Sequence, residues 1–293
     1  METKQLVHRY YQSTVNHYAD QYSPSYQGYP ANLKRLETLV RRARELKIKT
    51  LLDCGCGEAT PIARLHDEAG VEVWGFDFSE EMTRTAAAKL ESMGLKKRIW
   101  SGDITQASSF HPIGIEHPKA FDACLAAGVF PHLTDSQEAA ALKNMAGAVR
   151  TGGRVFVEFR NELFALFTLN RYSYELFTEK LIPTRVSREA SAELKGFFRL
   201  DLPAVRPNPA GASSSIDEIF CRFKNPFECP DLFRKAGLKI EAFHFYHFHA
   251  LPPMLEAKFP KAFRAASLAM EKMPSDWRGY FMASAFVVES CKE

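Results

Sequence analysis

Three carboxylates and a glycine-rich turn are the residues of this chain best placed to do chemistry. Asp53 stands two residues before Gly55, Gly57 follows, Asp77 comes twenty residues after Gly57, and Asp103 lies further along. Glycine at the turn permits positive φ and lets a ligand lie against bare backbone. A carboxylate at the spacing of Asp77 is placed to hold ribose hydroxyls. The pattern therefore predicts a nucleoside ligand.

Two nucleoside-binding families compete for this pattern. A dinucleotide-binding fold expects a third glycine at position 60, where this chain has Thr60. Acids after the first three strands are instead typical of class I methyltransferases, and Asp53, Asp77 and Asp103 supply them. From about residue 50 to residue 161 the chain resembles the class I (Rossmann-like) S-adenosylmethionine-dependent methyltransferases of the small-molecule type.

The resemblance implies a role for each residue of the pattern, with S-adenosylmethionine as cofactor and S-adenosylhomocysteine as product. The methionine end, the ribose hydroxyls and the adenine would be held in turn by Asp53, Gly55 and Gly57, by Asp77, and by Asp103 with Ile104, while Phe78 and Met82 flank the adenine. One position departs from the family: Ala59 stands where glycine is common, which leaves the backbone less freedom.

His132 is the candidate catalytic residue, as a general base. Methyl transfer is an in-line displacement, so the protein mainly aligns two reactants, but a hydroxyl acceptor also needs a base. His132 follows the fourth predicted strand and is expected at the carboxyl edge of the sheet, where ligands bind. The alternative of equal weight is a histidine that bonds a loop or caps the helix beginning near Thr134 or Asp135.

Two further groups are candidates for the acceptor and the cofactor. Arg160 and Asn161 follow the fifth predicted strand and are expected to bind the acceptor, unless they are surface residues at the start of an insertion. Tyr11, Tyr18 and Tyr22 fall at helical spacing. The first two are expected to close over the cofactor and the third to touch the acceptor, although such an aromatic stripe is more often core.

Alternating apolar and helical periods from residue 50 onward predict a doubly wound α/β sheet of seven mostly parallel strands, the last antiparallel. The predicted strands are 50–54, 71–76, 98–100, 121–126, 154–159, 238–250 and 280–289. The predicted helices are 60–69, 80–92, 135–149 with a stop at Gly152-Gly153, 230–237 and 254–273. An N-terminal helical lid (1–48), a core (49–159 and 226–293) and an inserted acceptor cap (160–225) follow from this order.

The composition limits the classes of partner that the protein is expected to bind. Thirty-eight Lys and Arg against 35 Asp and Glu give a net charge of only +3, which does not suggest a nucleic-acid binder. The N-terminus has no apolar leader, and no stretch is long enough to span a membrane, so a cytoplasmic protein is expected. A homodimer is compatible with these features as the oligomeric state.

No metal site is predicted. Cys54 and Cys56 have no second ligand pair at zinc-like spacing. Strict alternation over 243–249 puts His247 and His249 on one strand face with Phe243 and Phe245, and His244, Tyr246 and Phe248 on the other. These histidines also lack an acidic or cysteine partner in the sequence pattern.

The sequence thus predicts an O- or N-methyltransferase acting on a small polar metabolite, in natural-product or sugar-type biosynthesis. The size of the insertion and of the last inter-strand helix favours a covered pocket for such an acceptor. A module that binds the cofactor without turnover is the alternative of another class, and an NAD-dependent dehydrogenase is a distant third.

Overall fold

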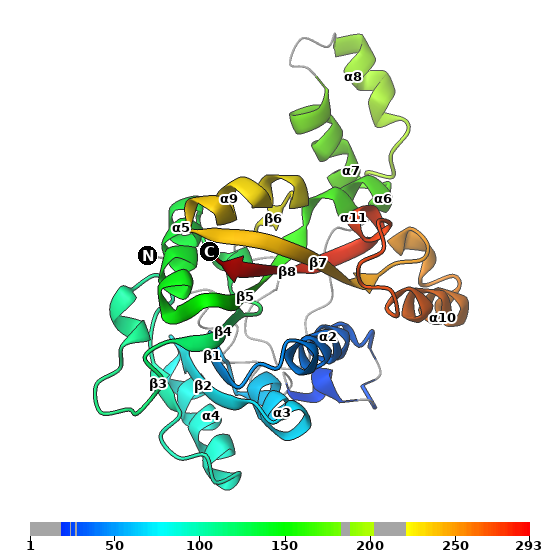
Figure 1. Cartoon of the computed structure of the whole chain (residues 1–293). Helices are drawn as coiled ribbons and strands as arrows, with labels where there is room; N and C mark the ends of the chain where they lie inside the picture. Colours follow the sequence, from blue (N-terminus) through cyan, green and yellow to red (C-terminus); the bar gives the residue numbers. More distant parts are fainter. Residues whose placement is uncertain (1–18, 24, 27, 183–187, 202–220) are drawn as a thin grey trace.

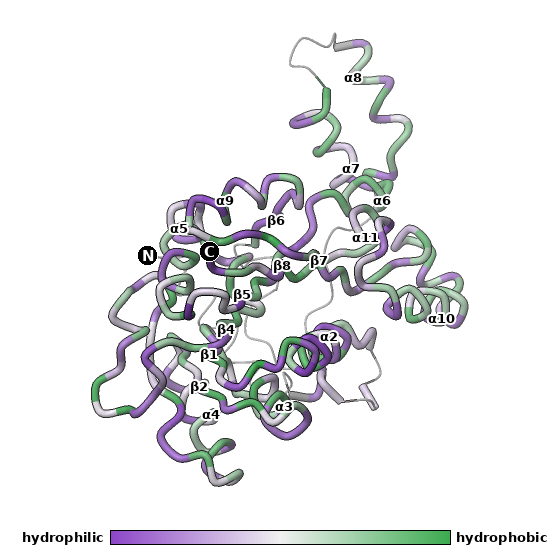
Figure 2. Tube along the Cα trace, in the orientation of Figure 1, coloured by the Kyte–Doolittle hydropathy of each residue, from purple (hydrophilic) through white to green (hydrophobic). Residues whose placement is uncertain are grey.

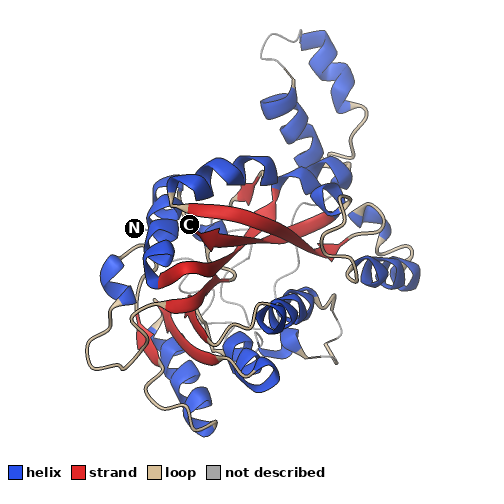
Figure 3. Ribbon diagram, in the orientation of Figure 1, coloured by secondary structure: helices blue, strands red, loops and turns tan. Residues whose placement is uncertain are grey.

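The computed structural model describes residues 19–23, 25–26, 28–182, 188–201 and 221–293. A mixed sheet runs through the centre of this described part, with helices on both faces (Figures 1 and 3). Its strands are β1 (Thr50–Cys54), β2 (Glu72–Asp77), β3 (Ile99–Ser101), β4 (Phe121–Ala126), β5 (Val149–Asn161), β6 (Phe223–Lys224), β7 (Leu238–Phe248) and β8 (Ala283–Lys292).

The strand order confirms the predicted architecture. The main path runs β3-β2-β1-β4-β5-β8-β7. β1 pairs in parallel with β2 and β4, whereas β8 is antiparallel to β5 and β7. The short β6, which pairs with β5, is an addition. Two residues carry too little of an apolar pattern to reveal a strand.

Both faces of the sheet are covered, which explains why its strands are almost continuously apolar. The longer helices are α2 (Ala31–Glu45), α3 (Thr60–Ala69), α4 (Glu80–Ser92), α5 (Asp135–Ala148), α9 (Cys229–Lys235) and α10 (Pro260–Met270). In β1, Leu52 and Cys54 enter the apolar core that contains α5 and α9, and Leu51 enters the core that contains α2, α3 and α4. Period-two alternation therefore builds two cores from one sheet.

Two predicted helix ends are wrong. The helix α5 stops at Ala148, and Gly152 and Gly153 lie inside β5. A Cβ on Gly153 would come 2.7 Å from the carbonyl oxygen of Arg150, so this glycine is needed for a close backbone approach. The helix predicted over 254–273 begins only at Pro260, because proline suits a first helical turn and interrupts a continuous one.

The N-terminal lid and the inserted cap are described in part. Tyr11 and Tyr18 lie outside the described residues, but the second predicted helix is present as α2. Both hydrophilic and hydrophobic residues colour α2 in Figure 2, and its buried residues include Leu33, Leu36 and Leu39. The insertion contains α6 (Ala165–Thr168), α7 (Arg171–Leu176) and α8 (Arg188–Lys195), and α7 and α8 project from the main body (Figure 1). The three-part domain division stays a prediction.

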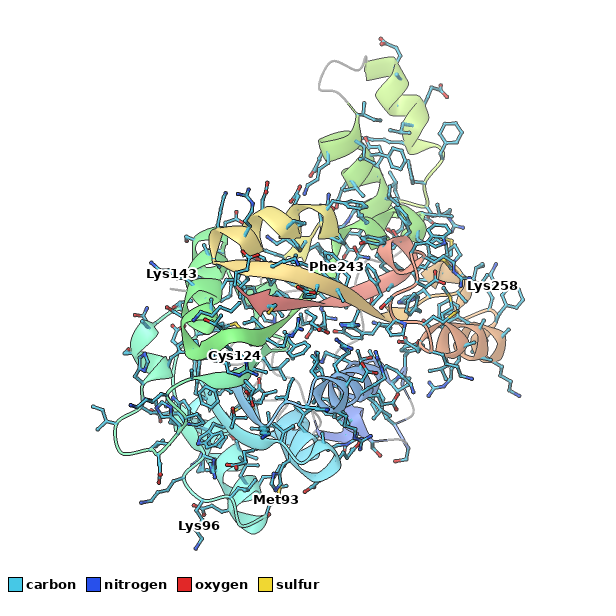
Figure 4. The ribbon with its side chains drawn as sticks, viewed as in Figure 1. Met93, Lys96, Cys124, Lys143, Phe243 and Lys258 are labelled. Atoms are coloured by element: carbon cyan, nitrogen blue, oxygen red, sulfur yellow. The ribbon has the colours of Figure 1, made fainter. Side chains whose placement is uncertain are left out.

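Side chains divide between interior and surface as the two cores require. Cys124 is buried in the middle of the sheet, whereas Lys96, Lys143 and Lys258 are exposed at the periphery (Figure 4). Among the described residues, no helix combines the length and the apolar character needed to cross a bilayer.

A buried ion cluster ties α2 to strands β7 and β8. Glu289 of β8 accepts hydrogen bonds from Nε and Nη2 of Arg42, both at 2.7 Å, and lies 2.9 Å from Nε2 of His244. Burial raises the pKa of Glu289, but the bonds from His244 and Arg42 outweigh burial and lower that pKa to about 2. The cluster therefore holds an ionised carboxylate inside the fold.

Replacing Glu289 with alanine is expected to lower the free energy of unfolding at pH 7 by about 3 kcal/mol, because Arg42 loses its charge partner. Since the folded pKa lies below the ordinary value of 4.5, this stabilisation is complete above that pH and is lost as pH falls towards 2. Urea unfolding across this range measures it. The control is Glu37→Ala, which breaks a surface pair with Lys34 and should cost below about 1 kcal/mol. Equal losses in both variants would contradict the assignment.

Candidate functional site

The turn after β1 requires its glycines. Gly55 has φ +102°, and a Cβ there would come 2.3 Å from Cγ2 of Val129. Its N–H donates to the carbonyl of Phe76 at 2.8 Å. Gly57 has φ +54°, and Ala59 is also left-handed at φ +68°, which costs an alanine about 1–2 kcal/mol. Positive φ at residues 55, 57 and 59 thus gives the main chain of this turn a shape with few side-chain atoms over it.

Asp77 fixes this turn from the neighbouring strand. It ends β2, and its Oδ2 accepts a hydrogen bond from the N–H of Gly57 at 3.0 Å. Its Oδ1 accepts from the N–H of Ser79 at 2.9 Å. The carboxylate predicted to hold the ribose hydroxyls therefore contacts the predicted backbone cradle directly.

Asp53 carries an unsatisfied oxygen in the interior. The residue is 2% exposed, and within the described chain its Oδ1 has no hydrogen-bond partner. Burial raises the pKa of Asp53 to about 8, with Arg35 opposing the rise and Asp77 adding to it. A buried carboxyl oxygen without a donor is suited to receive an ammonium group from a ligand.

Asp53→Asn is expected to stabilise the unliganded chain more at pH 8 than at pH 5, by about 3 kcal/mol. The folded pKa of about 8 lies above the ordinary 3.8, so the folded state binds the extra proton and wild-type stability falls as pH rises between these values. Asparagine does not ionise, so its burial carries no such pH-dependent loss of stability. Urea unfolding at both pH values tests the difference. The exposed Asp67, changed to asparagine, should show no such divergence, and a pH-independent effect of Asp53→Asn would refute the argument.

Asp103 and the residues predicted to contact the adenine lie near the ends of β2 and β3. Asp103 follows β3, and its Oδ1 accepts from the N–H and Oγ1 of Thr105 at 2.9 and 2.8 Å. Met82 and Ile104 are buried, whereas Phe78 is 43% exposed. Since β3, β2 and β1 are parallel neighbours, the three acids lie at one edge of the sheet. The order also reverses between β1 and β4, which is where ligands bind in such sheets.

His132 lies at the same edge, beyond β4. It ends the short 3₁₀-helix Phe130–His132 and is half-buried. The helix cap considered as its alternative role is provided by Thr134 and Gln137, whose reciprocal hydrogen bonds close the first turn of α5. The role of His132 as a base stays a prediction.

The predicted acceptor ligands have different surroundings. Asn161 is 1% exposed, and its Nδ2 donates to the carbonyls of Tyr280 and Ala283 at 2.9 and 2.8 Å. Its amide protons therefore anchor the end of β5 to the segment before β8. Arg160 is half-buried, with Nη1 3.9 Å from Oε1 of Glu158. The assignment of both residues to the acceptor stays a prediction.

A buried network was missed by sequence reasoning. Glu158 of β5 is fully buried and accepts hydrogen bonds from Nη1 of Arg35 and, at 2.5 Å, from the hydroxyl of Tyr246. Nη2 of Arg35 donates to the hydroxyl of Tyr22 at 2.8 Å, which places Tyr22 in the interior. Burial raises the pKa of Glu158, but Arg35 and Arg160 outweigh it and keep the pKa below its ordinary value. One signal was available: Arg35 lies four residues before Leu39, on the buried helix face.

The strand faces predicted over 243–249 are wrong after Tyr246. His247 has φ +57°, which interrupts the alternation. Phe248 consequently packs in the same core as Phe245, while Tyr246 belongs to the other core. The His247 ring lies 4.9 Å from Tyr29, a residue of the segment that leads into α2. Alternation fails because a left-handed residue turns the following side chain to the opposite face.

Comparison with known proteins agrees with the fold. Residues 51–153 match a family model described as a methyltransferase domain. A magnesium protoporphyrin IX methyltransferase from Synechocystis PCC 6803, solved with bound S-adenosylhomocysteine, is similar in fold: TM-score 0.56, 13% identity, 99% of this chain and 100% of that chain covered. A S-adenosylmethionine-dependent methyltransferase from Methanosarcina mazei gives TM-score 0.52 and 14% identity over 86% of this chain and 96% of that one.

A curated relative is similar over a shorter stretch. The tRNA U34 carboxymethyltransferase of Idiomarina loihiensis is 30% identical over 117 residues, which are 39% of this chain and 33% of that protein. The chain therefore matches about a third of the length of this relative.

Residues 51–153 thus match a methyltransferase domain, and the fold is similar to that of Rossmann-like methyltransferases. The residues present suit S-adenosylmethionine as a ligand. Asp53 offers an unsatisfied carboxyl oxygen to the amino group, and at Gly57 a Cβ would meet nothing within 4 Å, so the main chain there is open to a ligand.

Proposed function

We propose that this protein transfers a methyl group from S-adenosylmethionine to an oxygen or nitrogen of a small polar metabolite, with S-adenosylhomocysteine as product. One observation carries the proposal: the buried, unsatisfied Oδ1 of Asp53 stands beside a turn whose glycines have positive φ and whose shape is fixed by Asp77. In this proposal Asp53 and the turn hold the methionine end, and Asp77 holds the ribose hydroxyls.

The remaining cofactor contacts come from β3 and α4. Asp103 and Ile104 would receive the adenine amine and ring, with Met82 buried below and Phe78 partly exposed beside it. When bound, the sulfonium supplies an electrophilic methyl group. The protein then needs to align the acceptor, exclude water and accept a proton.

Arg160 and His132 would act on the acceptor. Both are half-buried at the edge beyond β4 and β5. Arg160 would orient the acceptor, and His132 would take the proton of a hydroxyl through an imidazole nitrogen. A small acceptor, not a nucleic acid, is favoured by the net charge of only +3. A cytoplasmic, biosynthetic role, with a homodimer as the assembly, completes the proposal.

Two measurements on the full chain test the function. Calorimetric titration with S-adenosylhomocysteine and, separately, with NAD is expected to show binding of the former alone. Release of S-adenosylhomocysteine with a library of small hydroxyl and amine acceptors should then reveal turnover. Preference for NAD would indicate a dehydrogenase, and tight nucleoside binding with no turnover on any acceptor would indicate a non-catalytic module.

His132→Ala is expected to lower turnover by about 10²–10⁴-fold for a hydroxyl acceptor, because the proton loses its base. Affinity for S-adenosylhomocysteine should stay near the wild-type value, since His132 is assigned to the acceptor. His111→Ala, at an exposed histidine, is the matched control and should turn over normally. Wild-type turnover by the His132 variant would remove it as the base.

A further inference from the structure

Two imidazoles meet at the half of the sheet edge that the cofactor residues leave vacant. Because β8 is antiparallel to both β5 and β7, β7 runs in the same direction as β5. Tyr246 stands opposite Ala285, which stands opposite Arg160. At about 4.8 Å per strand, the end of β7 lies roughly 10 Å across the sheet from Arg160. His247 and His249 therefore belong to the edge where the acceptor is expected.

The two rings form a pair with aromatic neighbours. The centroids of His247 and His249 are 4.7 Å apart. His247 is half-buried, and His249 is 6% exposed. The ring of Tyr29 lies 4.9 Å from that of His247, and the ring of Phe164 lies 4.6 Å from that of His249. The pair is thus enclosed by the segment before α2 and by the start of the insertion.

The backbone of His247 is held in a strained conformation. A left-handed conformation, here with φ +57°, costs an ordinary residue about 1–2 kcal/mol. Glu271 maintains it by accepting hydrogen bonds from the backbone N–H groups of His247 and Phe248, the latter at 2.9 Å. Strain of this kind in a residue that neighbours a ligand edge is typical of functional sites.

The ring of His247 is oriented by a second contact. Ser284 of β8 places its Oγ 2.7 Å from Nδ1 of His247. A hydrogen bond on one imidazole nitrogen fixes the direction of the other. The arrangement has the supporting contacts that a preformed binding group requires.

Charged groups of both signs surround the histidine pair. Glu271 receives the hydroxyl of Tyr29 at 2.6 Å as well as the backbone N–H groups. Burial raises the pKa of both Glu271 and Tyr29. Arg264 and Lys34 add positive charge to this cluster, and Glu256 adds negative charge. Within this mixed cluster, the N–H groups of two imidazoles can donate hydrogen bonds to carboxylate or phosphate oxygens.

We propose that His247 and His249 form a subsite that binds an anionic oxygen group, a carboxylate or a phosphate, on the methyl acceptor. The inference rests on the proposed function and deepens it, because it names the acceptor as an acidic metabolite. A metal is not the ligand argued for: among the described ranges, no three His, Cys, Asp or Glu side chains are grouped to hold one.

Nuclear magnetic resonance of the full chain labelled with ¹³C-histidine tests the subsite. Acetate and inorganic phosphate are the probes, and His247→Gln and His249→Gln assign the two resonances. Millimolar acetate, phosphate or both should move the two resonances together. His247→Gln should weaken this probe binding by about tenfold or more, because a charge-assisted hydrogen bond is lost. His111→Gln, at an exposed site, should leave it unchanged.

Ser284→Ala provides a second variant that keeps both imidazoles, in case the buried His249 cannot be replaced without unfolding. It should also weaken probe binding, since the His247 ring loses its orienting contact. A response to acetate alone or to phosphate alone supports the subsite and selects the acidic group. Titration with S-adenosylhomocysteine is run on the same samples. Normal nucleoside binding with unmoved histidine resonances overturns the subsite alone, whereas absent nucleoside binding overturns the proposed function and the subsite with it.

Discussion

Gly55→Val raises the dissociation constant for S-adenosylhomocysteine by more than about a hundredfold, the largest effect expected for any single substitution in the turn. The Cβ of the new side chain would lie 2.3 Å from Cγ2 of Val129, which is shorter than any allowed van der Waals contact. The backbone at φ +102° also disfavours a β-branched residue. The turn or Val129 must therefore move, which distorts the loop assigned to the ligand. Calorimetric titration measures the change.

A matched control separates strain from lost binding. Gly114 also has positive φ, at +76°, but a Cβ there would meet nothing within 4 Å. Gly114→Val should therefore strain the backbone without changing nucleoside affinity. Similar affinities in the wild type and in Gly55→Val, with both folded by circular dichroism, would show that the ligand does not lie against this turn.

Asp77→Ala has the second large effect. It is expected to weaken S-adenosylhomocysteine binding by about 10²–10⁴-fold, since two hydrogen bonds to a charged group are worth about 1.5–3 kcal/mol each. In the wild type the backbone N–H groups of Gly57 and Ser79 donate to this carboxylate, and the variant leaves both without that acceptor. The loss thus combines missing ribose contacts with a loosened turn. Titration and thermal unfolding together report both parts.

Asp122 offers a close control within the same sheet. It lies at the start of β4, at the opposite edge, and its Oδ2 accepts from the backbone N–H groups of Lys49 and Thr50 at 2.9 and 3.1 Å. Asp122→Ala should cost comparable stability because it also leaves two backbone donors unpaired. Its nucleoside affinity should stay normal. If the two variants bind equally well, Asp77 has only a structural role.

Local patterns were sufficient for much of the fold. The bounds of α3 and α4 are as predicted, and β1 and β4 begin and end at the predicted residues. Each of these elements has a clear period and a turn or cap beside it, so neighbours in sequence carry the information. The same holds for the acids after β1, β2 and β3, since parallel strands bring their ends to one edge.

Side-chain partners far apart in the chain were beyond such patterns. Arg35 and Glu158 are separated by 123 positions, and nothing in either local sequence names the other. Burial of an ion pair depends on how α2 packs on the sheet, which is a property of the assembled core. The contact of Tyr22 with Arg35 and that of Asn161 with Tyr280 were beyond local patterns for the same reason.

The sequence by itself determined the class of domain and the sheet edge where its three acids lie, because glycines and carboxylates at fixed intervals act through short stretches of chain. Only the tertiary structure decided three features: the left-handed backbone of His247, the burial of Asn161 and the ion pair between Arg35 and Glu158. Those features depend on Glu271, on the segment before β8 and on helix packing. Each results from contacts between segments that meet only after the sheet has formed.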